Sequence, residues 1–230
     1  MQFDIQYRPA HSLAIVHLGQ NETVRAEASA MISMTANVRV ETTGPLGRGG
    51  GGILAGLKRS VLGGETFFTN TFTATGSPGH VTLAPAVSGD MVTHELRPGE
   101  DLLIQGSSYV AAPDSVQLDT RWQGFKGFFS GENLFFLHAS GVGPVLMNAF
   151  GAIEVIDLAG ELIVDTGHLV AFTSGISYEI STASSGLIAS WLSGEGFVLR
   201  VSGHGRLYLQ SRNPQEYGRS VGSKLPARQG

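Results

Sequence analysis

The feature that most constrains the fold of this chain is an internal repeat, in which two different sequence blocks recur three times in the same order. Each copy of the first block has a turn with glycine, an apolar strand, a turn of small residues and a strand of alternating polar and apolar residues. Such alternation is typical of a strand with one buried side and one solvent-facing side. The copies of this first block occupy residues 17–42, 95–120 and 157–182.

The second block opens with Gly-Glu, continues as an apolar strand, and is predicted to reverse at a glycine-rich hairpin turn into another strand. Its copies occupy residues 64–85, 131–150 and 194–213. Because two independent blocks repeated in one order are hard to obtain by chance, the sequence predicts three copies of one structural unit. The predicted units cover residues 1–86, 87–151 and 152–213, followed by a polar C-terminal tail at 214–230 that we expect to be peripheral or mobile.

A connector lies between the two blocks of each predicted unit. Its apolar residues are spaced as on one face of a short amphipathic helix, and both tryptophans of the chain lie in connectors. We therefore expect a short helix at each connector. The three connectors read GGILAGLKRSVLG, RWQGFKGFFS and SSGLIASWLS.

The composition favours many short strands over long solvated helices. Only 15% of the residues are charged, compared with roughly 25% in an ordinary globular chain, and there are 32 glycines. A unit of this size would bury little surface alone, and no linker rich in proline, serine or charge separates the copies. We therefore expect one compact all-β assembly of three small β-sandwich units around a pseudo-threefold axis.

Charge and cysteine content exclude several function classes. The net charge of −4 gives nonspecific nucleic-acid binding no global electrostatic support. The chain has no cysteine, which excludes disulfides, thiolate metal sites and cysteine nucleophiles. The first residues lack the pattern of a signal peptide, and no apolar run is unbroken enough for a membrane span. These features predict a cytoplasmic protein.

Three stretches of the chain resemble a known protein family. They read GLKRSVLGGETFF, GAIEVIDL and GEGFVLRVSGHGRLYLQSRN, and together they extend the resemblance over residues 1–213. The family comprises uncharacterised bacterial and archaeal proteins related to a fungal mitochondrial protein named for altered inheritance of mitochondria.

The resemblance implies a fold of three units similar to the tryptophan RNA-binding attenuator protein, which is a compact variant of the double-stranded β-helix. It also implies homo-oligomers, and it supplies no catalytic residues. RNA binding in the attenuator style needs cations at equivalent positions of the repeats. One such set of positions holds Arg39, Gln117 and Ser177, so RNA binding is not expected.

The glycine-rich stretch at 44–65, GPLGRGGGGILAGLKRSVLGGE, is similar to a phosphate-binding loop. Gly47, Gly49 and Gly52 match the dinucleotide-binding pattern G-x-G-x-x-G, and Glu65 lies roughly where a ribose-binding acid would be. The repeat explains Glu65 without a nucleotide, because the other two copies have the same Gly-Glu pair without a glycine loop. We therefore interpret the glycines as an insertion confined to the first unit, and we expect no cofactor.

Arg48, Lys58 and Arg59 make the same stretch locally cationic. An anion could bind at the start of the expected connector helix, although a solvated cationic face is the favoured interpretation. The apolar neighbours Ile53 and Leu54 could instead mark a contact with another subunit or a partner protein.

The repeats also place acidic residues at equivalent positions, where three carboxylates could converge on a hard cation such as Ca²⁺. The favoured alternative is that the first set bonds to local backbone and the second set faces solvent. The histidines lack the spacing of a zinc motif, so no metal site is expected. The first set is Glu65, Glu132 and Glu195, and the second is Glu41, Asp119 and Glu179.

The sequence therefore predicts a protein that is not an enzyme and that acts through assembly or partner binding. No catalytic motif is recognisable in the chain. Low charge and apolar connectors favour a homo-oligomer, and among oligomers a trimer, with an unidentified protein partner as a further expectation. The alternative is a binding module for a small ligand, an anion or RNA.

Overall fold

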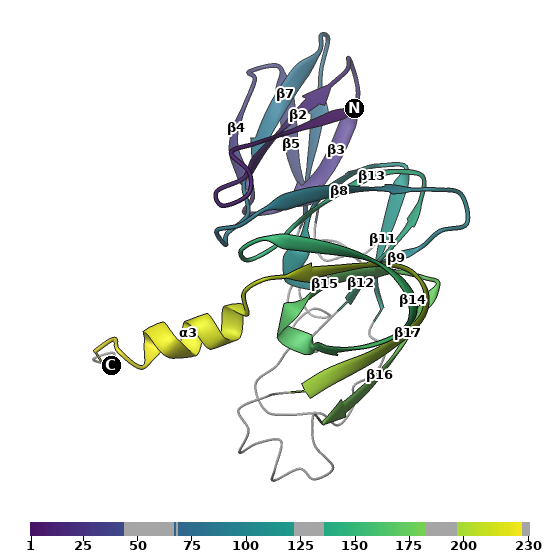
Figure 1. Cartoon of the computed structure of the whole chain (residues 1–230). Coiled ribbons are helices and arrows are strands. Elements are labelled where there is room, and N and C mark those ends of the chain that lie inside the picture. The colour runs from purple at the N-terminus through teal and green to yellow at the C-terminus, as the bar shows by residue number, and fades with distance from the viewer. Residues whose placement is uncertain (44–66, 68, 122–135, 183–196, 227–230) are drawn as a thin grey trace.

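The described residues of the protein are mostly in β-strands, which form three sheets (Figure 1). The computed structural model describes residues 1–43, 67, 69–121, 136–182 and 197–226. The all-β class expected from the glycine-rich, weakly charged composition is therefore confirmed. The expected connector helices lie outside the described residues.

The first sheet has four strands and contains the N-terminus. Its strands are amphipathic: in β2 the side chains of Ala14, Val16 and Leu18 are buried, while alternate residues are more exposed. This alternation arises because successive side chains of a strand point to opposite faces. In spatial order the strands are β1 (Gln2–Gln6), β2 (Leu13–Leu18), β7 (Gly79–Leu83) and β4 (Met31–Met34).

The second sheet has six strands and joins segments that are distant in the sequence. At its centre β10 pairs antiparallel with β3, and Ala111 lies opposite Ala26. In spatial order the strands are β5 (Val38–Thr43), β6 (Thr69–Ala74), β3 (Thr23–Glu27), β10 (Tyr109–Pro113), β13 (Gly143–Asn148) and β8 (Met91–Leu96).

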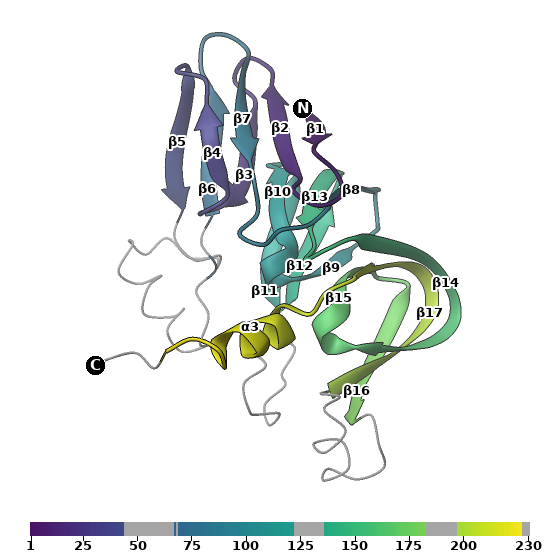
Figure 2. The same ribbon diagram turned by 60° about the vertical axis from the view of Figure 1, so that its left-hand side comes forward.

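The third sheet has seven strands and includes a long curled ribbon made by β14 and β17 (Figure 2). Within it β15 pairs with β9, and Ala171 lies opposite Ile104. In spatial order the strands are β11 (Val116–Arg121), β12 (Phe136–Gly141), β9 (Leu102–Gln105), β15 (Leu169–Thr173), β17 (Phe197–Gln210) and β14 (Ile153–Asp165), while β16 (Ile176–Thr182) pairs with the first half of β17.

The glycine-rich segments expected to be hairpin turns are sheet corners instead. The strands on either side of the first two segments, β6 and β7, and β12 and β13, belong to different sheets and do not pair with each other. In the third copy the strand is not interrupted, because residues 202–206 lie inside the continuous strand β17. Glycines in strands often mark such bends, because they adopt backbone angles that other residues avoid.

Short helical segments complete the described chain. Two 3₁₀ turns, η2 (Gly106–Ser108) and η3 (Thr166–His168), each lead into a buried strand. The tail expected at 214–230 begins with the helix α3 (Pro214–Gly222), which projects from the sheets. Asn213 caps this helix by accepting hydrogen bonds from the backbone N–H groups of Gln215 and Glu216. The helix has no buried residue, so it is peripheral as expected, but it is regular in structure.

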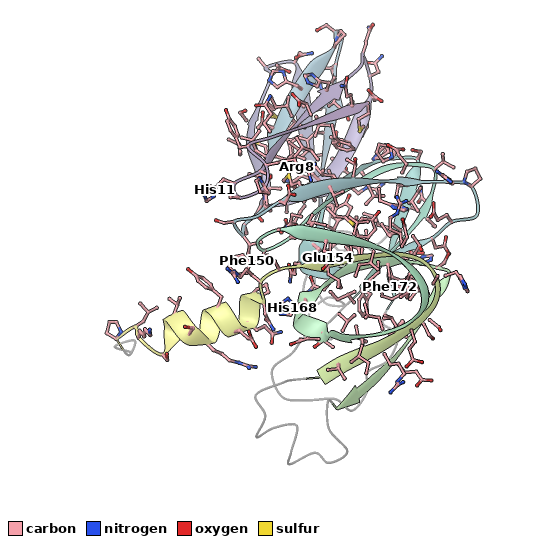
Figure 3. The ribbon with its side chains drawn as sticks, viewed as in Figure 1. Arg8, His11, Phe150, Glu154, His168 and Phe172 are labelled. Carbon is pink, nitrogen blue, oxygen red and sulfur yellow. The ribbon has the colours of Figure 1, made fainter. Side chains whose placement is uncertain are left out.

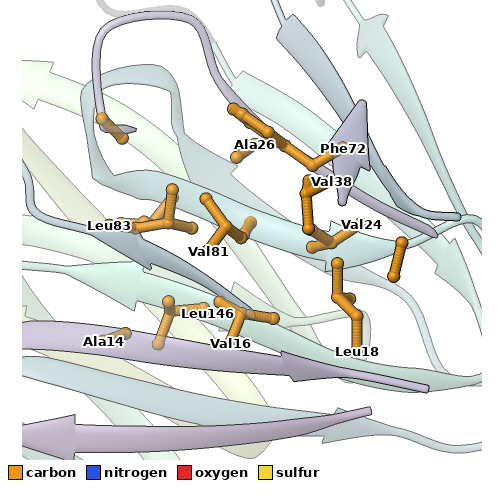
Figure 4. Close-up of a cluster of buried hydrophobic side chains, with 14 of the residues drawn as sticks. Ala14, Val16, Leu18, Val24, Ala26, Val38, Phe72, Val81, Leu83 and Leu146 are labelled. Atoms are coloured by element: carbon orange, nitrogen blue, oxygen red, sulfur yellow. The ribbon is translucent and has the colours of Figure 1, made fainter. Parts of the chain in front are cut away.

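The core consists of three clusters of buried apolar side chains. The cluster in Figure 4 is shared between the first two sheets: Val16 and Val81 come from the first, whereas Phe72 and Leu146 come from the second. Phe72, Val81 and Leu146 have no exposed surface. Burial of apolar side chains from both sheets removes apolar area from water and thereby stabilises their contact.

A paired substitution tests the corner interpretation. Gly160 and Gly203 lie opposite each other on β14 and β17 and have φ angles of +135° and +128°. Any other residue at such an angle costs about 1–3 kcal/mol. A Cβ at Gly203 would also lie 2.3 Å from the carbonyl oxygen of Gly175, whereas one at Gly160 would meet nothing within 4 Å.

We therefore expect Gly203→Ala to lower the free energy of unfolding more than Gly160→Ala does. Urea denaturation of both variants and the parent chain measures the difference. Equal losses in the two variants would contradict the predicted clash at the corner.

Candidate functional site

Strand β4 forms an unpaired edge of the first sheet. It pairs with β7 on one side, and on its other side no strand among the described residues pairs with it. Its apolar side chains are accessible, with Met31 41% and Ile32 55% exposed. An open edge offers a row of free backbone N–H and C=O groups that can pair with another strand.

Strand β14 forms a second unpaired edge, at the far end of the third sheet. It pairs with β17 along its whole length, and its outer side has no partner strand within the described part of the chain. Val155 is 48% and Ile163 59% exposed on this strand. Large apolar side chains on two open edges are therefore a shared property of β4 and β14.

Strands with two neighbours differ sharply from these edges. Every residue of β15 is buried, as are the first four residues of β10. Each of these strands is hydrogen-bonded on both sides, β10 by β3 and β13, and β15 by β9 and β17. The central strands β10 and β15 are therefore buried, whereas the edge strands β4 and β14 expose apolar side chains.

A polar cluster centred on His94 connects the second and third sheets. Nδ1 of His94, on β8, lies 2.7 Å from the hydroxyl oxygen of Tyr208, on β17. Nε2 of His94 lies 3.5 Å from Oε1 of Glu100. Burial lowers the pKa of His94 by more than the nearby carboxylates of Glu100 and Glu95 raise it, and Arg206 lowers it further. His94 is therefore held neutral at neutral pH.

Tyr208 connects the buried His94 to two residues at the surface, Arg206 and Asp157. Burial raises the pKa of Tyr208, which keeps its hydroxyl protonated, while the neighbouring Arg206 opposes that rise. Arg206 donates a hydrogen bond from Nε to Oδ1 of Asp157 on β14, over 3.2 Å. Both partners of this surface pair are accessible to solvent, so the pair contributes little to stability.

A second buried histidine, His138, pairs with the residue next to Glu100. Nε2 of His138, on β12, lies 3.0 Å from Oδ2 of Asp101, the residue that follows Glu100. The backbone of Asp101 is itself bonded to Ser174. Among the described residues, no group of three or more acidic, histidine or cysteine side chains could hold a metal ion. Asp101 therefore connects His138 of β12 with Ser174, the residue after β15.

A third polar centre, Asp90, connects the N-terminal hairpin to the start of β8. Its carboxylate accepts two hydrogen bonds from Arg8, at 2.7 and 2.9 Å, and a third from Ser12. Burial alone would raise the pKa of Asp90, but these bonds and that from the Met91 N–H lower it overall. Figure 3 shows Arg8 beside β8, where the first sheet meets the rest of the chain. A carboxylate with this many donors is a structural anchor.

The candidate residues from the sequence fall into two groups. The exposed second acidic set lies on separate strands: Glu41 on β5, Asp119 on β11 and Glu179 on β16. Six other candidates lie outside the described residues, namely Arg48, Lys58, Arg59, Glu65, Glu132 and Glu195.

Sequence reasoning did not find the polar centres. Arg8 and Asp90 are 82 positions apart, and His94 and Tyr208 are 114 positions apart. No spacing rule connects such pairs, because the strand order alone brings them together. The only available signal was the type of residue: a histidine or an aspartate within an otherwise apolar or small-residue context.

The state of His94 predicts a pH dependence of stability. A histidine whose pKa is lower in the folded chain than its ordinary 6.5 binds fewer protons when folded than when unfolded. The free energy of unfolding therefore falls as the pH drops below about 6.5. Removing this group, as in His94→Gln, should make that acid-side decline shallower in urea unfolding followed between neutral and mildly acidic pH.

The exposed His11 supplies the matched control. His11→Gln should keep the acid-side decline of the parent chain, because His11 lies in solvent. An unchanged decline in His94→Gln would show that His94 does not titrate in this way.

Comparison with known proteins places the chain in a family. A family model described as "Mitochondrial biogenesis AIM24" matches residues 3–212. An uncharacterised protein of Streptococcus pyogenes serotype M6 is 30% identical over 230 residues, covering 98% of this chain and 92% of the relative. The described residues include no helix long and apolar enough to cross a membrane.

A solved structure has the same architecture over almost the full length. The X-ray structure of a Streptococcus pyogenes protein, determined by a structural genomics consortium, superposes with a TM-score of 0.80 at 27% identity. It covers 97% of this chain, and this chain covers 99% of it. With a family match over nearly all of its length, this chain belongs to the AIM24 family.

Proposed function

We propose that this protein acts without catalysis, as a β-protein that assembles with other chains through its open sheet edges. The observation that carries the proposal is that two of the edge strands of the sheets, β4 and β14, expose the large apolar side chains of Ile32 and Ile163. Proteins usually protect such edges with charge, proline or a covering segment. Strand β14 carries four acidic residues, but β4 carries none, and the large apolar side chains exposed on both edges favour contact with another protein surface.

The proposal includes an internal organisation in three units, at 1–86, 87–151 and 152–213. It is supported by strand pairing that follows one scheme in the first two segments. In the first, β7 pairs with β2 and β4, and β6 pairs with β3 and β5. In the second, β13 pairs with β8 and β10, and β12 pairs with β9 and β11. In the third, the long strand β17 takes both central positions, with β14, β15 and β16 as its neighbours.

The same scheme supports the proposed likeness to the attenuator-protein fold. A homo-oligomer is part of the proposal, and a trimer is its simplest closed form with cyclic symmetry beyond a dimer. The absence of catalysis is proposed from the sequence, which offers no recognisable nucleophile motif. The polar groups around His94 and Asp90 act in this proposal as connections between sheets.

The proposal predicts that the chain associates at micromolar concentration, and that a lysine on an open edge weakens the association. Ile163→Lys places a charge where pairing would remove it from water, so we expect the association to weaken by about tenfold or more. Light scattering coupled to size-exclusion chromatography, over a range of concentrations, measures the mass.

Val142→Lys is the matched control, because Val142 is 50% exposed but lies between β12 and β13, away from both edges. It should associate like the parent chain. A parent chain that has the mass of a single copy at every concentration would contradict the proposed function.

A further inference from the structure

Two junctions in the chain are built by the same pairing rule. In each, a buried strand has a β-bulge against its partner from the same segment, between Tyr109 and Ala111 in β10 and between Leu169 and Ala171 in β15. The residue just after the bulge then lies opposite a strand of the preceding segment. Ala111 faces Ala26 of β3, and Ala171 faces Ile104 of β9.

Strand β4 has the same local geometry but lacks the second partner. Its pairing with β7 has a bulge between Met31 and Ser33, so Ser33 occupies the position that Ala111 and Ala171 occupy in their strands. No strand in the described part of the chain pairs with its outer edge. β4 is therefore a strand of the β10 and β15 type whose preceding segment is missing.

The second half of β14 has the complementary geometry. Ile104 lies two positions before the 3₁₀ turn η2, and Val164 lies two positions before η3. Leu102 and Ile104 of β9 are fully buried, and in β14 Val164 is only 5% exposed. Leu103, between the two buried residues of β9, is half-buried and lies opposite Phe172 of the neighbouring strand β15, whereas Ile163 is 59% exposed. This part of β14 is therefore a strand of the β9 type whose following segment is missing.

The two incomplete edges do not complete each other within one chain. They belong to different sheets. Figures 1 and 2 show β4 in the upper part of the molecule and the curled end of β14 in the lower part, so the two are separate in both views. A second chain is the partner that has both required strands in the required geometry.

We propose that β4 of one copy pairs antiparallel with the second half of β14 of a second copy. The register of the two existing junctions places Ser33 opposite Val164 and Met34 opposite Ile163. This inference rests on the proposed function, since it names the partner and the contact through which assembly occurs.

The chemistry of the two strands fits this pairing. Positions 33–35 of β4 and its flank are Ser, Met and Thr, and positions 162–164 of β14 are Leu, Ile and Val. None of these six positions carries a charge or lacks a backbone N–H, so the paired segment itself lacks the usual protection against pairing, and the nearest charges of β14 are those of Glu161 and Asp165 on either side of it. Met34 and Ile163 would form an apolar cross-strand pair, the kind of contact that stabilises sheets.

Each copy offers β4 at one end and β14 at the other, so copies join head to tail. Such an interface uses two different surfaces and repeats in one direction, which produces either a closed ring or a filament. Pairing of this kind extends a sheet across the junction between chains, as β10 and β15 do across the junctions within one chain.

Cysteine cross-linking tests the pairing in the full-length protein. The chain has no cysteine of its own, so Met34→Cys and Ile163→Cys introduce the only thiols. Residues directly opposite in an antiparallel pair have Cα atoms about 4.5–5.5 Å apart, which a disulfide can span. Mixing the two single variants under mild oxidation should give a disulfide-linked heterodimer.

Two control pairs define the register and the edge. Ser33→Cys mixed with Ile163→Cys is one position out of register, and this puts the two side chains on opposite faces. Val40→Cys, on the different edge strand β5 and 40% exposed in the parent chain, replaces Met34→Cys in the second control. We expect about tenfold more heterodimer from the matched pair than from either control.

The outcomes separate this inference from the proposed function. Association in light scattering without the matched cross-link would overturn the β4–β14 contact while leaving assembly in place. A single-copy mass would overturn both. In the double variant Met34→Cys/Ile163→Cys, a disulfide within one chain would show that the edges close on each other, and this too would overturn the pairing between copies.

Discussion

Antiparallel pairing between strands from distant segments is the interaction on which the rest of this structure depends. β10 and β15 are buried strands, and a buried backbone must have its N–H and C=O groups bonded. The partners that satisfy them on one side are β3 and β9, each contributed by the preceding segment of the chain. Without these two pairings the second and third sheets would each divide between two segments of the chain.

Polar side chains reinforce the same junctions. Asp90 holds the N-terminal hairpin through Arg8 and Ser12, and His94 bonds to Tyr208 between the second and third sheets. Apart from the exposed Arg8, these groups are buried, and buried polar groups stabilise a fold only when they are bonded. These groups also fix the relative position of the strands that they connect. Apolar surfaces can slide past each other, whereas the bidentate pair of Arg8 and Asp90 requires one geometry.

The edge strands β4 and β14 are the surfaces of this AIM24 family member on which the proposed assembly depends. A chain with few charges and apolar residues on two sheet edges would be prone to unspecific association if those edges stayed free. The proposed head-to-tail pairing would prevent such association, because it would occupy both edges. It would use the same strand register as the β10–β3 and β15–β9 pairs within the chain. The same geometry that joins β15 to β9 would then join one chain to the next.

The sequence by itself determined where many of the strands form. Alternation in β11 is an example: Val116 and Leu118 are buried, while Gln117 and Asp119 are exposed, as the period of two requires. The glycines at 141 and 203 also mark the places where the path of the chain bends. Such features are local, because they depend on the φ and ψ angles and the side-chain direction of a few neighbouring residues.

The tertiary structure alone decided which strands became neighbours. It turned expected hairpins into sheet corners. It also made β17 one unbroken strand where two shorter strands were expected, and it placed Gly160 inside β14 where a turn was expected. It also brought His94 to Tyr208 and left β4 and β14 unpaired. The physical reason is that a strand specifies its own amphipathic face but not its partner, since every backbone edge offers the same hydrogen-bonding groups. Partner choice follows only when the whole chain packs.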